Sequence, residues 1–197
     1  MKHILLIFAC ALFSTMIQAQ TYRCAFSGAS VKPIVTQVKN DFDKKLERVV
    51  EDILDEIAKE IGVNSYNYRA YPSSNVRNFQ VEFDESSREF NMYYSLTFLN
   101  NLYNTLSQDQ QLLDIIFVIT AHEFGHNLNG HVHIGGCDPK MELEADYFAG
   151  KTAAKHEIPY VFAVKVYNMC TSVGSTSTHP GRSERIESFR NGYKNGQ

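Results

Sequence analysis

The stretch SQDQQLLDIIFVITAHEFGHNLNG, residues 107–130, decides how this chain is expected to fold. It opens with Ser107 and Gln110 in an S-x-x-Q capping box, which is typical of a helix start. Apolar residues then occur on nearly every side of the expected helix up to Leu128, and the Asn-Gly pair at 129–130 is a typical helix end. We therefore predict a long, central and buried helix over these residues.

The second half of this stretch contains His122-Glu123-Phe124-Gly125-His126, an H-E-x-x-H motif. Residues four apart on a helix lie about 40° apart around the axis, so both imidazoles can bind one ion. The glutamate lies on nearly the same face, where it can take a proton from a metal-activated water. The motif predicts one zinc ion per chain, bound by His122 and His126, with Glu123 as the general base.

A catalytic zinc site needs a third protein ligand and one open position. The pattern with a late histidine requires glycine at position 129 and histidine at position 132, but the chain has Asn129 and Val132. The remaining option is a carboxylate from the next predicted helix, where Glu142 and Asp146 share one face. We predict Glu142 as the third ligand and Asp146 as the acceptor for the other nitrogen of a zinc-binding histidine.

The rest of the chain predicts further helices and one small sheet. Apolar residues at helical spacing predict an amphipathic helix at 41–61, and proline and cap signals start helices at 139–156, at 159–171 and from Pro180. Alternation at 79–83, a polar turn and the aromatic run at 90–96 predict a β-hairpin or a small antiparallel sheet. The expected fold class is α+β and mostly helical.

Three sequence blocks, in order, resemble the gluzincin metalloproteases of the HtpX heat-shock protease and CAAX-prenyl endopeptidase type. They are AHEFGH at 121–126 with His131 behind it, Glu142-x-x-Ala145-Asp146, and STHP at 177–180 with Arg185-Ile186. The resemblance implies a zincin-like domain with endopeptidase activity, Glu142 as third ligand, and functional roles for His179 and Arg185. Integral membrane members carry several transmembrane helices, whereas this chain shows none after residue 19 and is similar to exported members.

Two residues of the last block also have a physical case of their own. His179 precedes Pro180 in a polar loop, where it can stabilise an oxyanion, cap the metal in a resting state, or simply be solvated. Arg185 can brace a carboxylate such as Asp146, or bind a substrate terminus, or be a surface charge. The remaining histidines at 131, 133 and 156 are expected at helix ends or on the surface.

The N-terminus predicts export. Lys2 and the short apolar run at 4–13 are typical of a secretory signal over residues 1–19, which leaves one metalloprotease domain at 20–197 in the periplasm or outside the cell. No transmembrane anchor is then expected. The formal net charge of −3 gives no indication of nucleic acid as a partner.

Export also makes a disulfide plausible among Cys24, Cys137 and Cys170. We expect the last two to pair, since this would join the segments that carry His126, Glu142 and His179. The two pairings that involve Cys24 stay open, because three cysteines cannot all pair within one chain.

The expected function is hydrolysis of peptide bonds in a protein or peptide substrate. The substrate is expected to bind as an extended strand beside residues 91–96, because a strand edge offers matching N–H and C=O groups. The alternative is a non-catalytic zinc-binding or chaperone-like module on the same fold. Glu123 favours the enzyme, because a binding module needs no general base.

Overall fold

The computed structural model describes residues 22–26, 31–63, 67–106, 109–134 and 138–197. The expected signal at 1–19, the cap residue Ser107 and Cys137 lie outside these ranges. The elements run in the order β1 (Tyr22–Ala25), α1 (Asp41–Glu60), β2 (Tyr68–Pro72), β3 (Phe79–Asp84), β4 (Glu89–Tyr94), α2 (Leu96–Thr105), α3 (Asp109–Leu128), α4 (His131–Ile134), α5 (Pro139–Lys155), α6 (Tyr160–Cys170) and α7 (Arg182–Gly196). The predicted α+β class and its mostly helical character are confirmed.

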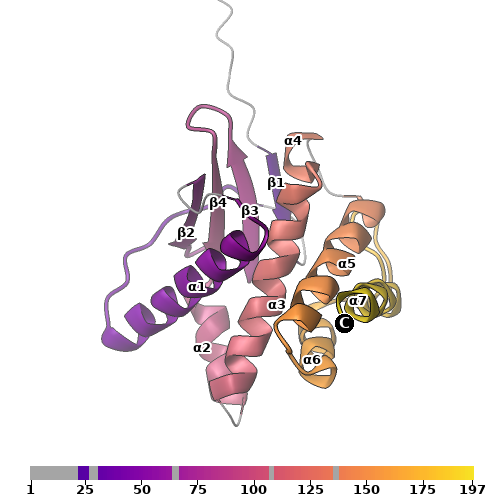
Figure 1. Ribbon diagram of the computed structural model, residues 1–197. Coiled ribbons are helices and arrows are strands. Elements are labelled where there is room, and N and C mark those ends of the chain that lie inside the picture. The colour runs from indigo at the N-terminus through magenta and orange to yellow at the C-terminus, as the bar shows by residue number, and fades with distance from the viewer. Residues whose placement is uncertain (1–21, 27–30, 64–66, 107–108, 135–137) are drawn as a thin grey trace, which may run out of the picture.

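Helix α3 is the centre of the fold, as its apolar sequence predicts. Figure 1 shows it between the sheet with α1 on one side and α5, α6 and α7 on the other. Its side chains from Ile115 to Ile119 are all buried, because neighbouring elements cover every face. The H-E-x-x-H motif therefore lies in the interior, where its polar groups need partners.

The sheet is mixed, so of the two expected forms, a β-hairpin or a small antiparallel sheet, only the hairpin is present. Its strand order is β1-β3-β4-β2, and the predicted hairpin of β3 and β4 is confirmed. Strand β2, however, runs parallel to β4 at the far edge of the sheet. It ends at Pro72, which cannot donate a backbone hydrogen bond and is therefore suited to an edge strand.

Strand β4 lies inside the sheet, and this rules out the expected substrate strand at 91–96. Its neighbours β3 and β2 pair with it on both sides, so it has no free edge for a peptide. The strand also ends earlier than expected. The hydroxyl of Ser95 accepts a hydrogen bond from the Phe98 amide at 3.2 Å and caps α2, which takes Leu96 as its first residue.

Helices α5, α6 and α7 confirm the three segments predicted from Pro139 onward, although the last helix begins at Arg182 and not at Pro180. Helix α7 packs along α5. Cys170, one half of the expected disulfide, is a free thiol packed against the core, and its expected partner Cys137 lies outside the described residues. Burial raises the pKa of this thiol to about 12.

None of the helices in the described ranges combines the length and the apolar character that a membrane crossing requires.

Candidate metal centre

Three fully buried side chains converge between α3 and α5. The Nε2 atoms of His122 and His126 are 3.0 Å apart, and Glu142 places Oε2 3.5 Å from the first and Oε1 3.3 Å from the second. An ion with tetrahedral ligands about 2.0–2.1 Å away spaces those ligands about 3.3–3.4 Å apart. The three groups are therefore spaced to hold a metal ion, which confirms that the predicted residues meet.

The local sequence explains how the carboxylate reaches the imidazoles. The two histidines lie one turn apart on α3, and Gly125 between them faces α5. A Cβ at this glycine would lie 2.9 Å from the Cα of Ala145, closer than real Cβ contacts allow. Because the position lacks a side chain, α5 packs directly on the motif and brings Glu142, one turn before Ala145, over the histidines.

The carboxylate of Glu142 fits a cation. Both oxygens are buried and have no hydrogen-bond partner of normal geometry in the described structure. Burial opposes ionisation, but the contact with His126 and the charge of Arg185 hold the pKa of Glu142 below its ordinary value. A buried, ionised and under-partnered carboxylate beside two imidazoles is the donor set of a divalent metal site.

Asp146 orients the first histidine, as predicted. Its Oδ1 lies 2.8 Å from Nδ1 of His122, so this nitrogen donates and Nε2 keeps a lone pair for a metal. Burial lowers the pKa of His122 to about 4, which leaves the neutral imidazole that binds metals. Burial opposes ionisation of Asp146, yet the charge of Arg185 holds its pKa at about 2.

Arg185 is the partner of this aspartate and not a surface charge. Its side chain is 1% exposed, and its Nε and Nη2 donate to the two oxygens of Asp146 at 2.8 Å each. The hydroxyl of Tyr167 donates to the same carboxylate at 3.0 Å. Nη2 also lies 3.3 Å from Glu142 Oε2. The guanidinium of Arg185 thus offsets the negative charge of Asp146 and also contacts Glu142. His122, His126 and Glu142 are called the metal group below.

His131 belongs to the site: it lies at a helix end, as expected, but it is buried and not on the surface. The residue begins the short α4 but is only 2% exposed. Its Nδ1 lies 3.1 Å from Nδ1 of His126, and its Nε2 lies 2.9 Å from Glu144 Oε2. The sequence signal was Gly130, whose φ of 73° turns the chain back onto the end of α3.

The other two histidines lie away from the metal group. His133 is exposed and packs edge-on against Phe83 at 4.3 Å between ring centroids. His156 follows the end of α5 and contacts Glu56 and Glu60. Both agree with the expectation for helix-end residues.

Glu123 is fully buried, and neither of its oxygens has a hydrogen-bond partner of normal geometry among the residues described. Burial, and then the charge of Glu142, raise its pKa well above the ordinary value. The charge of Arg185 and the nearby backbone amides of Phe26 and Val81 oppose this rise only in part.

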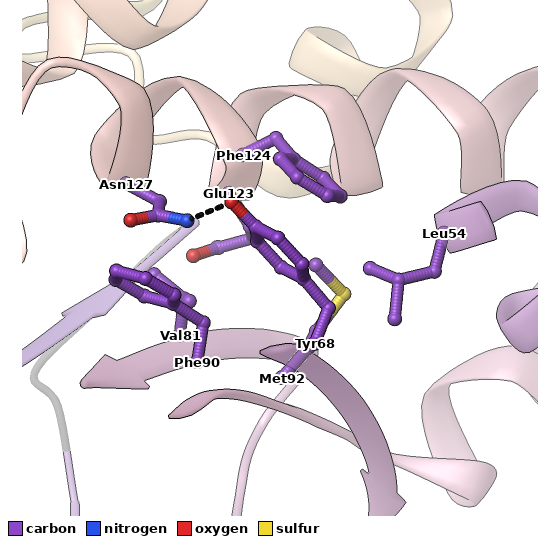
Figure 2. Close-up of a pocket in the computed structure, with 8 residues that line it drawn as sticks. All are labelled: Leu54, Tyr68, Val81, Phe90, Met92, Glu123, Phe124 and Asn127. Atoms are coloured by element: carbon purple, nitrogen blue, oxygen red, sulfur yellow. Dashed lines mark hydrogen bonds between the residues drawn. The ribbon is translucent and has the colours of Figure 1, made fainter. Parts of the chain in front are cut away.

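A small cavity of about 10 Å³ lies beside Glu123, large enough for about one water. Figure 2 shows the carboxylate at its wall, near the Tyr68 hydroxyl, which accepts a hydrogen bond from Asn127 at 2.7 Å. The remaining lining side chains are apolar: Leu54, Val81, Phe90, Met92 and Phe124. The cavity therefore offers polar contacts only at the end where the carboxylate lies.

His179 reaches the site from the loop between α6 and α7. Its side chain is 15% exposed, and its Nε2 lies 3.7 Å from Glu142 Oε1. The same nitrogen lies 3.2 Å from the backbone oxygen of Ala25 in β1. The structure thus places this histidine at the edge of the metal group, next to the backbone of another segment.

Comparison of the chain with protein-family models, with curated proteins and with solved structures finds no match. The functional conclusion therefore depends on the residues of the site.

Chemically, the site combines a three-ligand metal group with a buried carboxylate next to it and a histidine at its edge. Sequence reasoning placed the ligands, Glu123, Asp146, His179 and Arg185. It missed His131, which orients the second histidine, and Tyr167, which holds Asp146. Tyr167 carries no motif, and only the packing of α6 on α3 brings it to the site.

Proposed function

We propose that this chain is a zinc-dependent endopeptidase. The observation that carries the proposal is the near-tetrahedral spacing of His122, His126 and Glu142, which supplies three of the four ligands of a tetrahedral ion. Two imidazoles, one carboxylate and an open position are the ligand set of catalytic zinc. When bound, zinc supplies Lewis acidity and lowers the pKa of water at the site towards 7.

The chain's own residues then have distinct roles. Glu123 takes the proton of the attacking water as a general base and then gives it to the leaving amine as a general acid. His179 donates from Nε2 to the oxygen of the scissile carbonyl as negative charge develops there. Arg185 holds Asp146, and through it the ring of His122, so we assign it a positioning role within the site.

The proposal extends to the family, the location and the substrate class of the protein. The three ordered motif blocks support a gluzincin of the HtpX and CAAX-prenyl endopeptidase type with a zincin-like domain. We propose export through a signal at 1–19, to the periplasm or the exterior, and a protein or peptide as substrate. The central H-E-x-x-H helix beside a small sheet, with the third ligand on a following helix, supports this assignment.

A metal analysis combined with a cleavage assay tests the proposal. The mature chain and its Glu123→Gln variant should each bind one zinc, and the parent should cleave casein or members of a peptide library. The variant should lose at least about 100-fold in turnover, since general-base catalysis contributes roughly 10²–10⁴. Equal rates in the two proteins would contradict the role of Glu123, and absence of zinc would contradict the metal site.

A second candidate function is a non-catalytic zinc-binding module. The observation that favours it is the complete burial of all three ligands, each with 0% exposure. The cleavage assay separates the two functions, because a binding module would hold zinc in both proteins and hydrolyse nothing. The ring of Phe26, the residue after β1, covers one of these ligands, His122.

A further inference from the structure

Strand β1 covers the edge of the sheet that lies nearest to the metal group. It pairs antiparallel with β3, with Cys24 opposite Val81, and is the outermost strand on the side of α3 (Figure 1). The amide of Phe26 continues this pairing by donating to the carbonyl of Phe79 at 3.2 Å. An extended peptide brought to a hydrolytic site binds by pairing with such an edge. Here the chain's own N-terminal segment already holds that edge.

The backbone at the end of this strand contacts His179 and Arg185, two residues of the proposed site. The carbonyl oxygen of Ala25 lies 3.2 Å from Nε2 of His179. The next carbonyl, that of Phe26, accepts a hydrogen bond from Nη1 of Arg185 at 2.7 Å. The peptide group between Ala25 and Phe26 thus has His179 at its oxygen and the carbonyl of Phe79 at its nitrogen, and Arg185 holds the next carbonyl.

The Phe26 ring fills a pocket built from the same residues. It is fully buried and meets the ring of His122 edge-on, with centroids 4.8 Å apart. The guanidinium of Arg185 lies over it at 4.8 Å, and Tyr167 forms another wall at 5.9 Å. A ring in this position contacts a metal ligand directly, so the pocket belongs to the site.

We propose that residues 22–26 are an internal, substrate-like ligand that occupies the peptide groove of this site and keeps it closed. This inference rests on the proposed endopeptidase function, and it adds the substrate class and the means of control. The groove accepts an extended peptide in which a small residue, in the place of Ala25, precedes an aromatic residue, in the place of Phe26.

An incoming peptide must displace β1 before it can bind. Its apparent affinity is then its intrinsic affinity reduced by the fraction of molecules in which the groove is open. The ion pair between Arg23 and Glu82, with 2.8 Å between nitrogen and oxygen, adds to the attachment of the strand. Any change that weakens β1 should therefore tighten the binding of an external peptide.

The first test measures binding of a blocked fluorescent peptide that copies residues 22–26 with serine in place of cysteine. The host is the zinc-loaded mature chain with Glu123→Gln, so that binding is followed by anisotropy without cleavage. Adding Phe26→Ala should tighten binding by roughly tenfold or more, since the internal competitor loses its anchor. The matched control is Phe117→Ala, which removes another buried ring, one that contacts His156 away from β1.

Equal or weaker binding in the Phe26→Ala protein would overturn the proposal, since a strand that only completes the core gives that result. A second measurement uses the host without changes in β1. Saturating peptide should speed hydrogen exchange at the amide of Phe26, because the strand is released. Bound peptide with unchanged exchange there would equally overturn the proposal.

Failure of this inference and failure of the proposed function are distinguishable. Binding and exchange need no turnover, so a protein that binds the peptide and releases β1 but cleaves nothing would refute only the endopeptidase. A protein that cleaves peptides, with Phe26→Ala leaving their affinity unchanged, would refute only the internal ligand.

Discussion

The Nδ1 atom of His126 lies 3.1 Å from the Nδ1 atom of His131, and this contact fixes the direction of a hydrogen-bond chain. Glu144 accepts from Nε2 of His131 at 2.9 Å, which leaves Nδ1 of that ring as an acceptor. His126 must then donate from Nδ1 and keep the lone pair of Nε2 for the metal. Burial lowers the pKa of His131, in agreement with its neutral form.

This relationship predicts that His131→Ala weakens zinc binding without removing a ligand. We expect a 10–100-fold loss of affinity, as is typical when the partner of a metal-binding histidine is removed. Competition with a zinc chelator of known affinity measures it. His133→Ala, an exposed neighbour on the same short helix, is the control. Equal affinities in the two variants would show that the contact does not orient the ligand.

Removal of the third ligand should abolish tight metal binding. Glu142→Ala leaves two imidazoles, too few for a catalytic zinc site, and the protein should be purified with far less than one zinc per chain. Elemental analysis beside Glu187→Ala, an exposed carboxylate on α7, provides the comparison. Full zinc content in Glu142→Ala would move the third ligand to another residue, with His179 the nearest candidate.

The buried arginine predicts a large effect on stability. Arg185→Ala leaves Asp146 buried without its counter-charge, which costs about 3–5 kcal/mol of the free energy of unfolding. Arg190→Ala, on the exposed side of the same helix, should change it by less than about 0.5 kcal/mol. Urea unfolding of both variants gives the two values. A loss below about 1 kcal/mol for Arg185→Ala would contradict the balance of charges described above.

The contact between α1 and the end of α5 predicts a pH dependence of stability. Burial alone would raise the pKa of Glu60, but hydrogen bonds with Lys155 and His156 lower it below the ordinary value. A lowered pKa means that the carboxylate stabilises the fold above its unfolded pKa, near 4.5, and that this contribution is lost as pH falls through the folded pKa.

Glu60→Gln should therefore cost about 0.5–1 kcal/mol at pH 7 and almost nothing at pH 3. Urea unfolding across this range measures the difference, with Glu85→Gln, in the exposed β3–β4 turn, as control. A cost that persists at pH 3 would mean that the glutamate acts through packing and not through its charge.

The metal group could be predicted from the sequence because its geometry is local. The spacing of His122 and His126 fixes them on one helical face, and that of Glu142 and Asp146 does the same on the next helix. Only the contact between the two helices depends on distant parts of the chain. It was inferred because the residues of the two helices together form a metal-ligand set. The helices themselves were predicted from long apolar periodicities with clear caps.

What the sequence did not reveal depends on pairing between distant segments. The alternation in β1 is only four residues long, and its partner lies far along the chain, as the 59 residues between Arg23 and Glu82 show. The central place of β4 follows from the parallel pairing of β2, which no local pattern indicates. The burial of His131 depends on how the chain turns after Gly130 and on the approach of α5.

Two of the hydrogen bonds at the end of β1 join residues that are far apart in the sequence. His179 and Ala25 are 154 positions apart, and Arg185 and Phe26 are 159. During synthesis the strand emerges first, whereas the side chains that hold its carbonyls emerge last. Contacts between such distant segments form late in folding. The hydrogen bonds from His179 and Arg185 can therefore form only after the C-terminal part of the chain has been made, and in the proposed closed state they report that α7 has docked.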